Sequence, residues 1–198
     1  MEPASSAHKA SHKRADAHFV RCGIAEFALE RHGDDRPVAH FAAPRQCADM
    51  EETDDLANLA RIRSSFAKQG LMRTLGATLG DISRGSVEIS LSPSPAISQQ
   101  HGFVHAGAIS AVADTAAGYA ALSTMAPGRG VLTTEFKINL LAPAVGDRFI
   151  ARGKVLKAGK TLTLAQAEVF AEKDGALRLI AFLTATLMAI EGRDGITD

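Results

Sequence analysis

One polar loop and the stretch that follows it hold the residues best suited to chemistry. The loop reads QQHGFVHAG over residues 99–107, and the small, mostly apolar residues after it include one carboxylate, Asp114. A loop that enters a helix presents unpaired backbone N–H groups and the positive end of the helix dipole. Such a junction can stabilise a developing oxyanion, and a carboxylate nearby can act as a general base or as a nucleophile.

The elements that must position these residues follow from periodicity and from breaker residues. A helix is expected from Asp54 or Asp55 to about Lys68, where Gly70 ends it, and a long buried helix from about Ala106 to Met125. Alternation from Val131 to Leu140 predicts a half-buried strand. Further strands are expected at about 73–82, 85–92, 147–158, 160–172 and 176–190, the last two joined by a hairpin at 173–175.

This order of elements predicts an α+β fold. One helix and two strands come first, then the long central helix, then four strands. A curved antiparallel β-sheet wrapped around the long central α-helix, with an N-terminal helix beside it, accounts for all of them.

Composition separates the chain into regions and argues against nucleic acid and membranes as partners. Residues 1–50 carry five of the seven histidines and no sustained periodicity, which predicts a flexible N-terminal extension. The folded domain is expected over residues 51–192 and a short tail over 193–198. The 22 basic and 22 acidic side chains balance, so no global field attracts nucleic acid or a membrane surface. Every long apolar run contains too many polar residues to span a membrane.

The two cysteines, Cys22 and Cys47, form neither a disulfide framework nor a metal cluster. The beginning of the chain shows no basic-then-apolar signal segment. A cytoplasmic protein without a bound metal is therefore expected.

From about residue 54 to 190, the chain resembles the hotdog-fold acyl-CoA thioesterases of the phenylacetate-degradation (PaaI) type. The resemblance rests on Gln99, on His105-Ala106-Gly107 six residues later, on Asp114 nine residues after His105, and on the segment TTEFKINLLAP at residues 133–143. It implies a hydrolase that cleaves acyl-CoA thioesters with a medium-chain or aromatic acyl group. Coenzyme A would enter as part of the substrate, and no separate cofactor is implied.

The resemblance also assigns roles to individual residues. The backbone N–H of Ala106 would polarise the thioester carbonyl, and Asp114 would act as general base or as nucleophile. Family members commonly carry glycine where this chain has Ala106, but alanine keeps the N–H group. Gly107 would allow close backbone packing, His105 would help to place the thioester, and Gln99 would hold a carbonyl or a water molecule. Some relatives carry a hydroxyl residue one turn after the carboxylate, where this chain has Gly118.

Helix geometry places the two central groups far apart in one chain. Ala106 and Asp114 are separated by about 12 Å at 1.5 Å per residue. One carbonyl cannot contact both, so the site is expected to be shared across a homodimer, or a dimer of dimers, with the loop from one subunit and the carboxylate from the other. The family resemblance implies the same arrangement.

Several basic residues could meet the phosphates of coenzyme A. Arg129 and Gly130 are the preferred candidates, since glycine permits close approach of a phosphate to the backbone.

Two other functions fit the same elements. A non-catalytic acyl-CoA-binding hotdog module, as in a ligand-sensing transcriptional regulator, would require a DNA-binding segment, and residues 1–50 show neither a three-helix pattern nor a basic recognition helix. A hotdog enoyl-CoA hydratase or dehydratase would require a catalytic histidine paired with a carboxylate. Three assays would separate these functions. Release of thiol would indicate the hydrolase, a ligand-induced thermal shift without turnover the binding module, and hydration of enoyl-CoA the hydratase.

Overall fold

The computed structural model describes residues 28–30, 38–40 and 45–191, with side chains from residue 56 onward. The chain divides into two units, Met1–Met50 and Glu51–Asp198. In the first unit, β1 (Ala28–Glu30) pairs antiparallel with β2 (Val38–His40). Apart from these strands and residues 45–50, the predicted flexible extension lies outside the described residues. The predicted C-terminal tail lies outside them as well.

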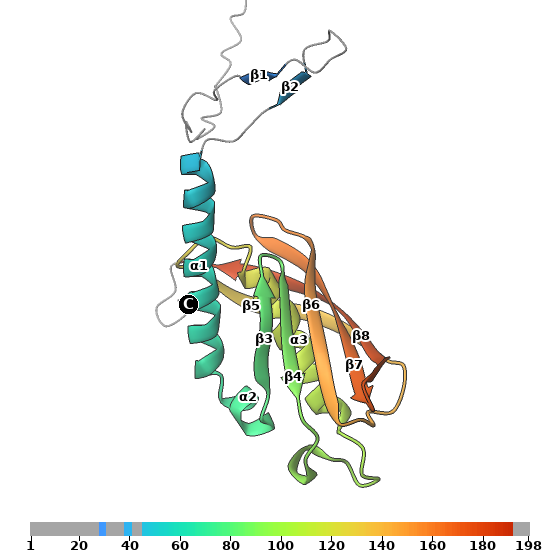
Figure 1. The fold of residues 1–198 in the computed structure, drawn as a ribbon. Coiled ribbons are helices and arrows are strands. Elements are labelled where there is room, and N and C mark those ends of the chain that lie inside the picture. Colours follow the sequence, from blue (N-terminus) through green and yellow to red (C-terminus); the bar gives the residue numbers. More distant parts are fainter. Residues whose placement is uncertain (1–27, 31–37, 41–44, 192–198) are drawn as a thin grey trace, which may run out of the picture. The chain divides into compact units, whose positions relative to one another are not determined.

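The second unit is built on one antiparallel sheet of six strands in the order β3-β4-β6-β7-β8-β5 (Figure 1). The strands are β3 (Thr78–Ser83), β4 (Ser86–Leu91), β5 (Gly130–Leu140), β6 (Arg148–Lys157), β7 (Leu162–Lys173) and β8 (Ala176–Ile190). The sheet wraps around α3 (Ala106–Leu122), which contacts every strand from β4 to β8. The predicted curved sheet around a central helix is therefore confirmed.

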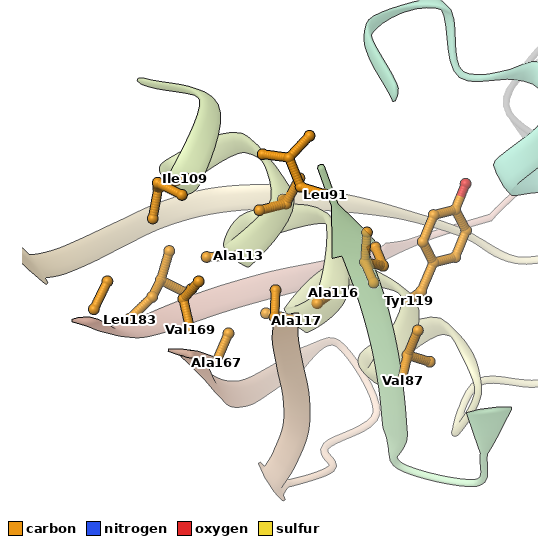
Figure 2. Close-up of a cluster of buried hydrophobic side chains, with 14 of the residues drawn as sticks. Val87, Leu91, Ile109, Ala113, Ala116, Ala117, Tyr119, Ala167, Val169 and Leu183 are labelled. Atoms are coloured by element: carbon orange, nitrogen blue, oxygen red, sulfur yellow. The ribbon is translucent and has the colours of Figure 1, made fainter. Parts of the chain in front are cut away.

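Small side chains let the sheet approach α3 closely. Ala113, Ala116 and Ala117 are fully buried and lie among strand side chains that include Val169 (Figure 2). At Gly153 of β6, a Cβ atom would lie 2.2 Å from the carbonyl oxygen of Ala116, so only glycine fits there. The alanine-rich sequence of the helix is thus a packing requirement of the fold.

The N-terminal helix is longer than its sequence pattern predicts. α1 runs from Arg45 to Lys68, so the predicted start at Asp54 or Asp55 is wrong by about nine residues. The residues from Arg45 to Thr53 include no proline or glycine, so nothing in them stops a helix. Asp54 and Asp55 are residue types that often cap a helix, but here they lie in its interior.

The region after α1 also differs from expectation. A short helix, α2 (Gly70–Leu75), occupies part of the predicted strand 73–82, and β3 begins only at Thr78. Gly70 starts this helix, whereas Gly76, with φ of +70°, caps its end. The N–H groups of Gly76 and Ala77 donate to the carbonyls of Arg73 and Met72, which is the usual way a glycine ends a helix.

Polar contacts hold α1 against the end of α3. The Arg61 guanidinium donates to the carbonyl oxygens of Leu122, Met125 and Ala126 at 2.8, 3.0 and 2.9 Å. The Leu122 carbonyl is at the end of α3, and Met125 and Ala126 lie in the turn that follows it. The neighbouring Ile62 is fully buried, so the part of α1 around Arg61 and Ile62 is packed into the second unit.

Along the described part of the chain, none of the helices combines the length and apolar character needed to cross a bilayer.

Candidate active site

The loop before α3 is a compact turn that fixes Gln99. The backbone N–H of Gln99 donates to the carbonyl of Phe103 at 2.8 Å, and the N–H of Gly102 donates back to the carbonyl of Gln99 at 2.9 Å. Gly102 has φ of +83°, a conformation that favours glycine. The side-chain oxygen of Gln99 accepts from the N–H of His101. The Gln99 side chain therefore takes part in shaping the loop.

His105 is the N-terminal cap of α3. Its Nδ1 accepts from the N–H of Gly107 at 2.8 Å, so a neutral ring carries its proton on Nε2. A Cβ atom at Gly107 would lie 3.0 Å from that Nδ1, so glycine makes room for the cap. The carbonyl of His105 accepts from Ala108 and Ile109, which starts the helix.

The N–H of Ala106 stands at the first position of α3, where no helical carbonyl is available as an acceptor. Ala106 and Gln99 line the same cavity of about 450 Å³, here called the loop cavity. The rest of its wall is apolar and consists of Phe103, Val104, Ile109, Leu140, Leu141, Ala142, Pro143, Ala144 and Ile180. The structure thus brings together the predicted oxyanion donor and the predicted glutamine.

Asp114 lies half-buried on α3 at the wall of a second cavity, also of about 450 Å³, here called the aspartate cavity. Its lining consists of Ser65, Lys68, Gln69, Leu71, Asp114, Thr115, Gly118, Tyr119, Val131 and Thr133. The hydroxyl of Thr133 donates to Oδ1 of Asp114 at 2.9 Å. Burial raises the pKa of the Asp114 carboxyl above its ordinary value of 3.8, and the hydrogen bond from Thr133 offsets part of the rise.

The sequence pattern missed Thr133. Strict alternation along β5 assigns Thr133 to the same face as Glu135, away from Phe136 and Ile138. The pairing of β5 with β8 is irregular between Thr133 and Glu135, so the alternation changes phase there. Thr133 is paired with the buried Leu187 and faces α3. Thr133 of β5 therefore places a hydroxyl beside Asp114, and only the irregular pairing of β5 could have indicated it.

The two cavities have no lining residue in common. Ala106 and Asp114 lie eight residues apart on the same helix, about 12 Å along its axis. Within one chain, the predicted oxyanion donor therefore lies in the loop cavity and the predicted base in the separate aspartate cavity.

The predicted phosphate-binding pair lies at the start of β5. Arg129 forms an ion pair with Glu191 at 3.0 Å and donates to the carbonyl of Lys160 at 3.2 Å. Gly130 is paired with Ile190 in the sheet. A phosphate at Arg129 would have to compete with Glu191, and the role of this pair in binding coenzyme A stays a prediction.

Comparisons with known proteins agree with this architecture. A family model described as the thioesterase superfamily matches residues 101–177, which include the loop from His101 onward, α3 and the strands from β5 to the start of β8. A thioesterase family protein from Silicibacter pomeroyi, known from a crystal structure, is 50% identical. That match covers 68% of this chain and 99% of the other, with a TM-score of 0.67.

Two more distant structures share the fold. The PaaI protein from the phenylacetic acid degradation operon of Escherichia coli is 19% identical over 68% of this chain and 94% of its own, with a TM-score of 0.60. A thioesterase from Haemophilus influenzae is 20% identical over 64% and 87%, with a TM-score of 0.59. The predicted hotdog fold is confirmed. With half of the aligned residues identical over 99% of the length of the Silicibacter pomeroyi protein, this chain belongs to the thioesterase superfamily.

Proposed function

We propose that this chain hydrolyses acyl-CoA thioesters, with Asp114 as the reactive carboxylate. The observation that carries the proposal is the setting of Asp114. The carboxylate lies at the wall of a cavity, is held in place by Thr133, and has a pKa raised by burial. A desolvated carboxylate in a cavity is a stronger base and nucleophile than one in water, and perturbed pKa values of this kind cluster at functional sites.

The reaction needs one water molecule and no redox partner. In the general-base form, Asp114 removes a proton as the water oxygen attacks the thioester carbonyl carbon. The C–S bond then breaks, and the leaving thiolate takes up the proton, which yields the free acid and coenzyme A. In the nucleophilic form, Asp114 itself attacks and water hydrolyses the resulting anhydride. In both forms, the N–H of Ala106 stabilises the developing oxyanion.

The two halves of the site come together if two copies of the chain associate. We infer that the loop cavity of one subunit opens onto the aspartate cavity of the other, because the two groups are too far apart within one chain. The free edge of the sheet supports this. β5 is an edge strand, and it exposes Leu132, Phe136 and Leu140 by 44, 47 and 54%. Long apolar edges are normally covered.

A panel of acyl-CoA thioesters tests the proposed function. Release of free thiol from medium-chain or aromatic acyl-CoA is the expected result. The Asp114→Asn variant should be slower by at least about 100-fold, the usual scale for the loss of a general base. The matched control is Asp81→Asn, which changes an exposed aspartate on β3 and should retain wild-type turnover.

Two other outcomes would redirect the interpretation. A thermal shift with acyl-CoA but no thiol release would indicate a binding module. Hydration of enoyl-CoA without thiol release would indicate a hydratase. Either result would contradict hydrolysis as the function.

A further inference from the structure

A third cavity lies between α1, the turn that joins β3 to β4, and the segment that follows α3. It has a volume of about 630 Å³, within the range of small-molecule sites, and is here called the helix-end cavity. Its lining consists of Ala57, Asn58, Arg61, Arg84 and residues 124–127. None of these residues lines the loop cavity or the aspartate cavity. The helix-end cavity is therefore separate from the candidate active site.

Hydrogen bonds to the backbone fix the polar part of this lining. The side-chain amide of Asn58 donates to the carbonyl of Ser123 at 2.6 Å, and the Thr124 hydroxyl donates to the carbonyl of Ala121 at 2.8 Å. The Arg61 guanidinium donates to Oδ1 of Asn58 at 2.8 Å, in addition to the carbonyls described above. These donors serve the end of α3 and the turn after it, so the shape of the cavity is set by the protein itself.

Arg84 supplies a charged group to the same cavity. Its side chain is exposed, and within the described part of the chain it has no hydrogen-bond or ion-pair partner. The backbone next to it is firmly held, because the N–H of Gly85 donates to Oγ of Ser123 at 2.7 Å and the carbonyl of Gly85 accepts from the N–H of Val155 at 2.8 Å. The guanidinium of Arg84 is thus anchored beside the cavity with its donors available.

The rest of the lining is apolar. Met125 is half-buried and packs against the hydrophobic core, and Ala57, Ala126 and Pro127 are exposed. The thioether side chain of methionine adapts its shape to apolar partners. None of the described side chains in the lining is acidic. The cavity therefore combines one available positive group with an apolar surface.

We propose that the helix-end cavity binds a small carboxylate with a short apolar body, which places the carboxylate on Arg84 and the apolar body against Met125. A guanidinium pairs with a carboxylate through two parallel hydrogen bonds. A phosphate dianion would need further donors, whereas those of Asn58, Arg61 and Thr124 already serve backbone carbonyls. The bound carboxylate contacts α1, the turn between β3 and β4, and the segment after α3. This site goes beyond the proposed function and does not depend on it.

Nuclear magnetic resonance of the full chain, with isotope-labelled methionine methyl groups, tests the proposal. The chain has five methionines, and Met125→Leu identifies the signal of Met125. Hexanoate should shift this signal with a Kd on the order of 1 mM. Hexanamide has the same length but no charge, so it should bind at least about tenfold more weakly, the scale of hydrogen bonds to a charged group.

Two pairs of variants locate the binding site. Arg84→Gln should weaken hexanoate binding at least about tenfold, whereas Arg178→Gln changes an exposed arginine of β8 outside the lining and should keep the wild-type affinity. Ala57→Leu fills part of the cavity and should weaken binding at least about fivefold, the scale of overpacking. Ala60→Leu is its matched control, because Ala60 is an exposed alanine on α1 outside the lining. Thermal unfolding of each variant shows whether the fold is retained.

Unchanged hexanoate binding in folded Arg84→Gln would overturn the proposal, as would equal affinities for hexanoate and hexanamide. Shifts of other methionine signals without that of Met125 would mean that the acid binds elsewhere, which also contradicts it. If inorganic phosphate shifts the Met125 signal as strongly as hexanoate does, the apolar body plays no part and the proposed ligand class is wrong. No thioester is hydrolysed in these measurements, so their failure is distinct from a failure of the proposed function.

Discussion

At the scale of single residues, Asp114 combines two opposing influences. Burial raises its pKa, and the hydrogen bond from Thr133 lowers it, with burial the larger effect. The carboxylate therefore lies in a place that disfavours its charged form. Such local instability is the usual cost of a reactive group.

This setting predicts how Asp114 affects stability at different pH values. Because its pKa is raised in the folded state, the folded protein binds this proton more tightly than the unfolded chain does. The free energy of unfolding therefore decreases as pH rises from the ordinary value of 3.8 through the raised pKa, and stays lower above it. Asp114→Asn lacks this titration. The variant should unfold at higher temperature than the wild-type protein at about pH 7, and the difference should shrink toward about pH 4.

Thermal unfolding of both proteins across this pH range provides the measurement. The exposed Asp81→Asn variant provides the control, since the same chemical change there removes no buried charge. A lower unfolding temperature for Asp114→Asn at neutral pH would show that Asp114 is structural.

At the scale of elements, α1 stabilises the end of α3 through Arg61. Its guanidinium donates to three carbonyls at that end. Arg61→Met keeps much of the side-chain length but removes these donors. We expect a loss of about 2 kcal/mol in the free energy of unfolding, the scale of hydrogen bonds from a charged group. The control is Arg63→Met, which changes an exposed arginine on the same helix.

Chemical denaturation of the two variants measures the difference. Similar stabilities for Arg61→Met and Arg63→Met would mean that water replaces the guanidinium without loss. Because α1 also supplies Ser65 to the aspartate cavity, and Gln69 follows directly after α1, Arg61→Met should alter substrate selectivity as well.

The sequence predicted most elements, because their signals are local. Alternation placed β5, and the turn at Asp174 and Gly175 was readable because such a turn needs φ above zero, here 52 and 76°. The junction from loop to helix and the lone Asp114 were equally visible. The start of α1 and the presence of the helix α2 were not predicted. Apolar spacing alone cannot separate a capping residue from an interior one.

The candidate site was predictable only in part. His105, Ala106 and Gly107 were found from their order in the loop, but the cap from His105 to Gly107 depends on the ring orientation. Thr133 was hidden by the irregular pairing of β5. Tyr119 meets Ser65 and Gln69 across 54 and 50 residues of sequence, and no local pattern signals such a contact.

At the scale of the whole molecule, the central claim is that an active site forms between two copies of the chain. Each subunit has a loop cavity with Ala106 and an aspartate cavity with Asp114, and these share no lining residue. A shared site explains why the two groups can be far apart in one subunit and still act on one carbonyl.

Mixing two inactive variants tests this claim most directly. Ala106→Pro removes the N–H donor at the first helical position, where proline is well tolerated, and Asp114→Asn removes the carboxylate. Each variant alone should lose roughly 100-fold in turnover. When the two are unfolded and refolded together, half of the dimers should be mixed, and each mixed dimer should hold one intact site. The predicted result is recovery of about a quarter of wild-type activity, whereas no recovery from mixed dimers shown to be folded would contradict a site shared between subunits.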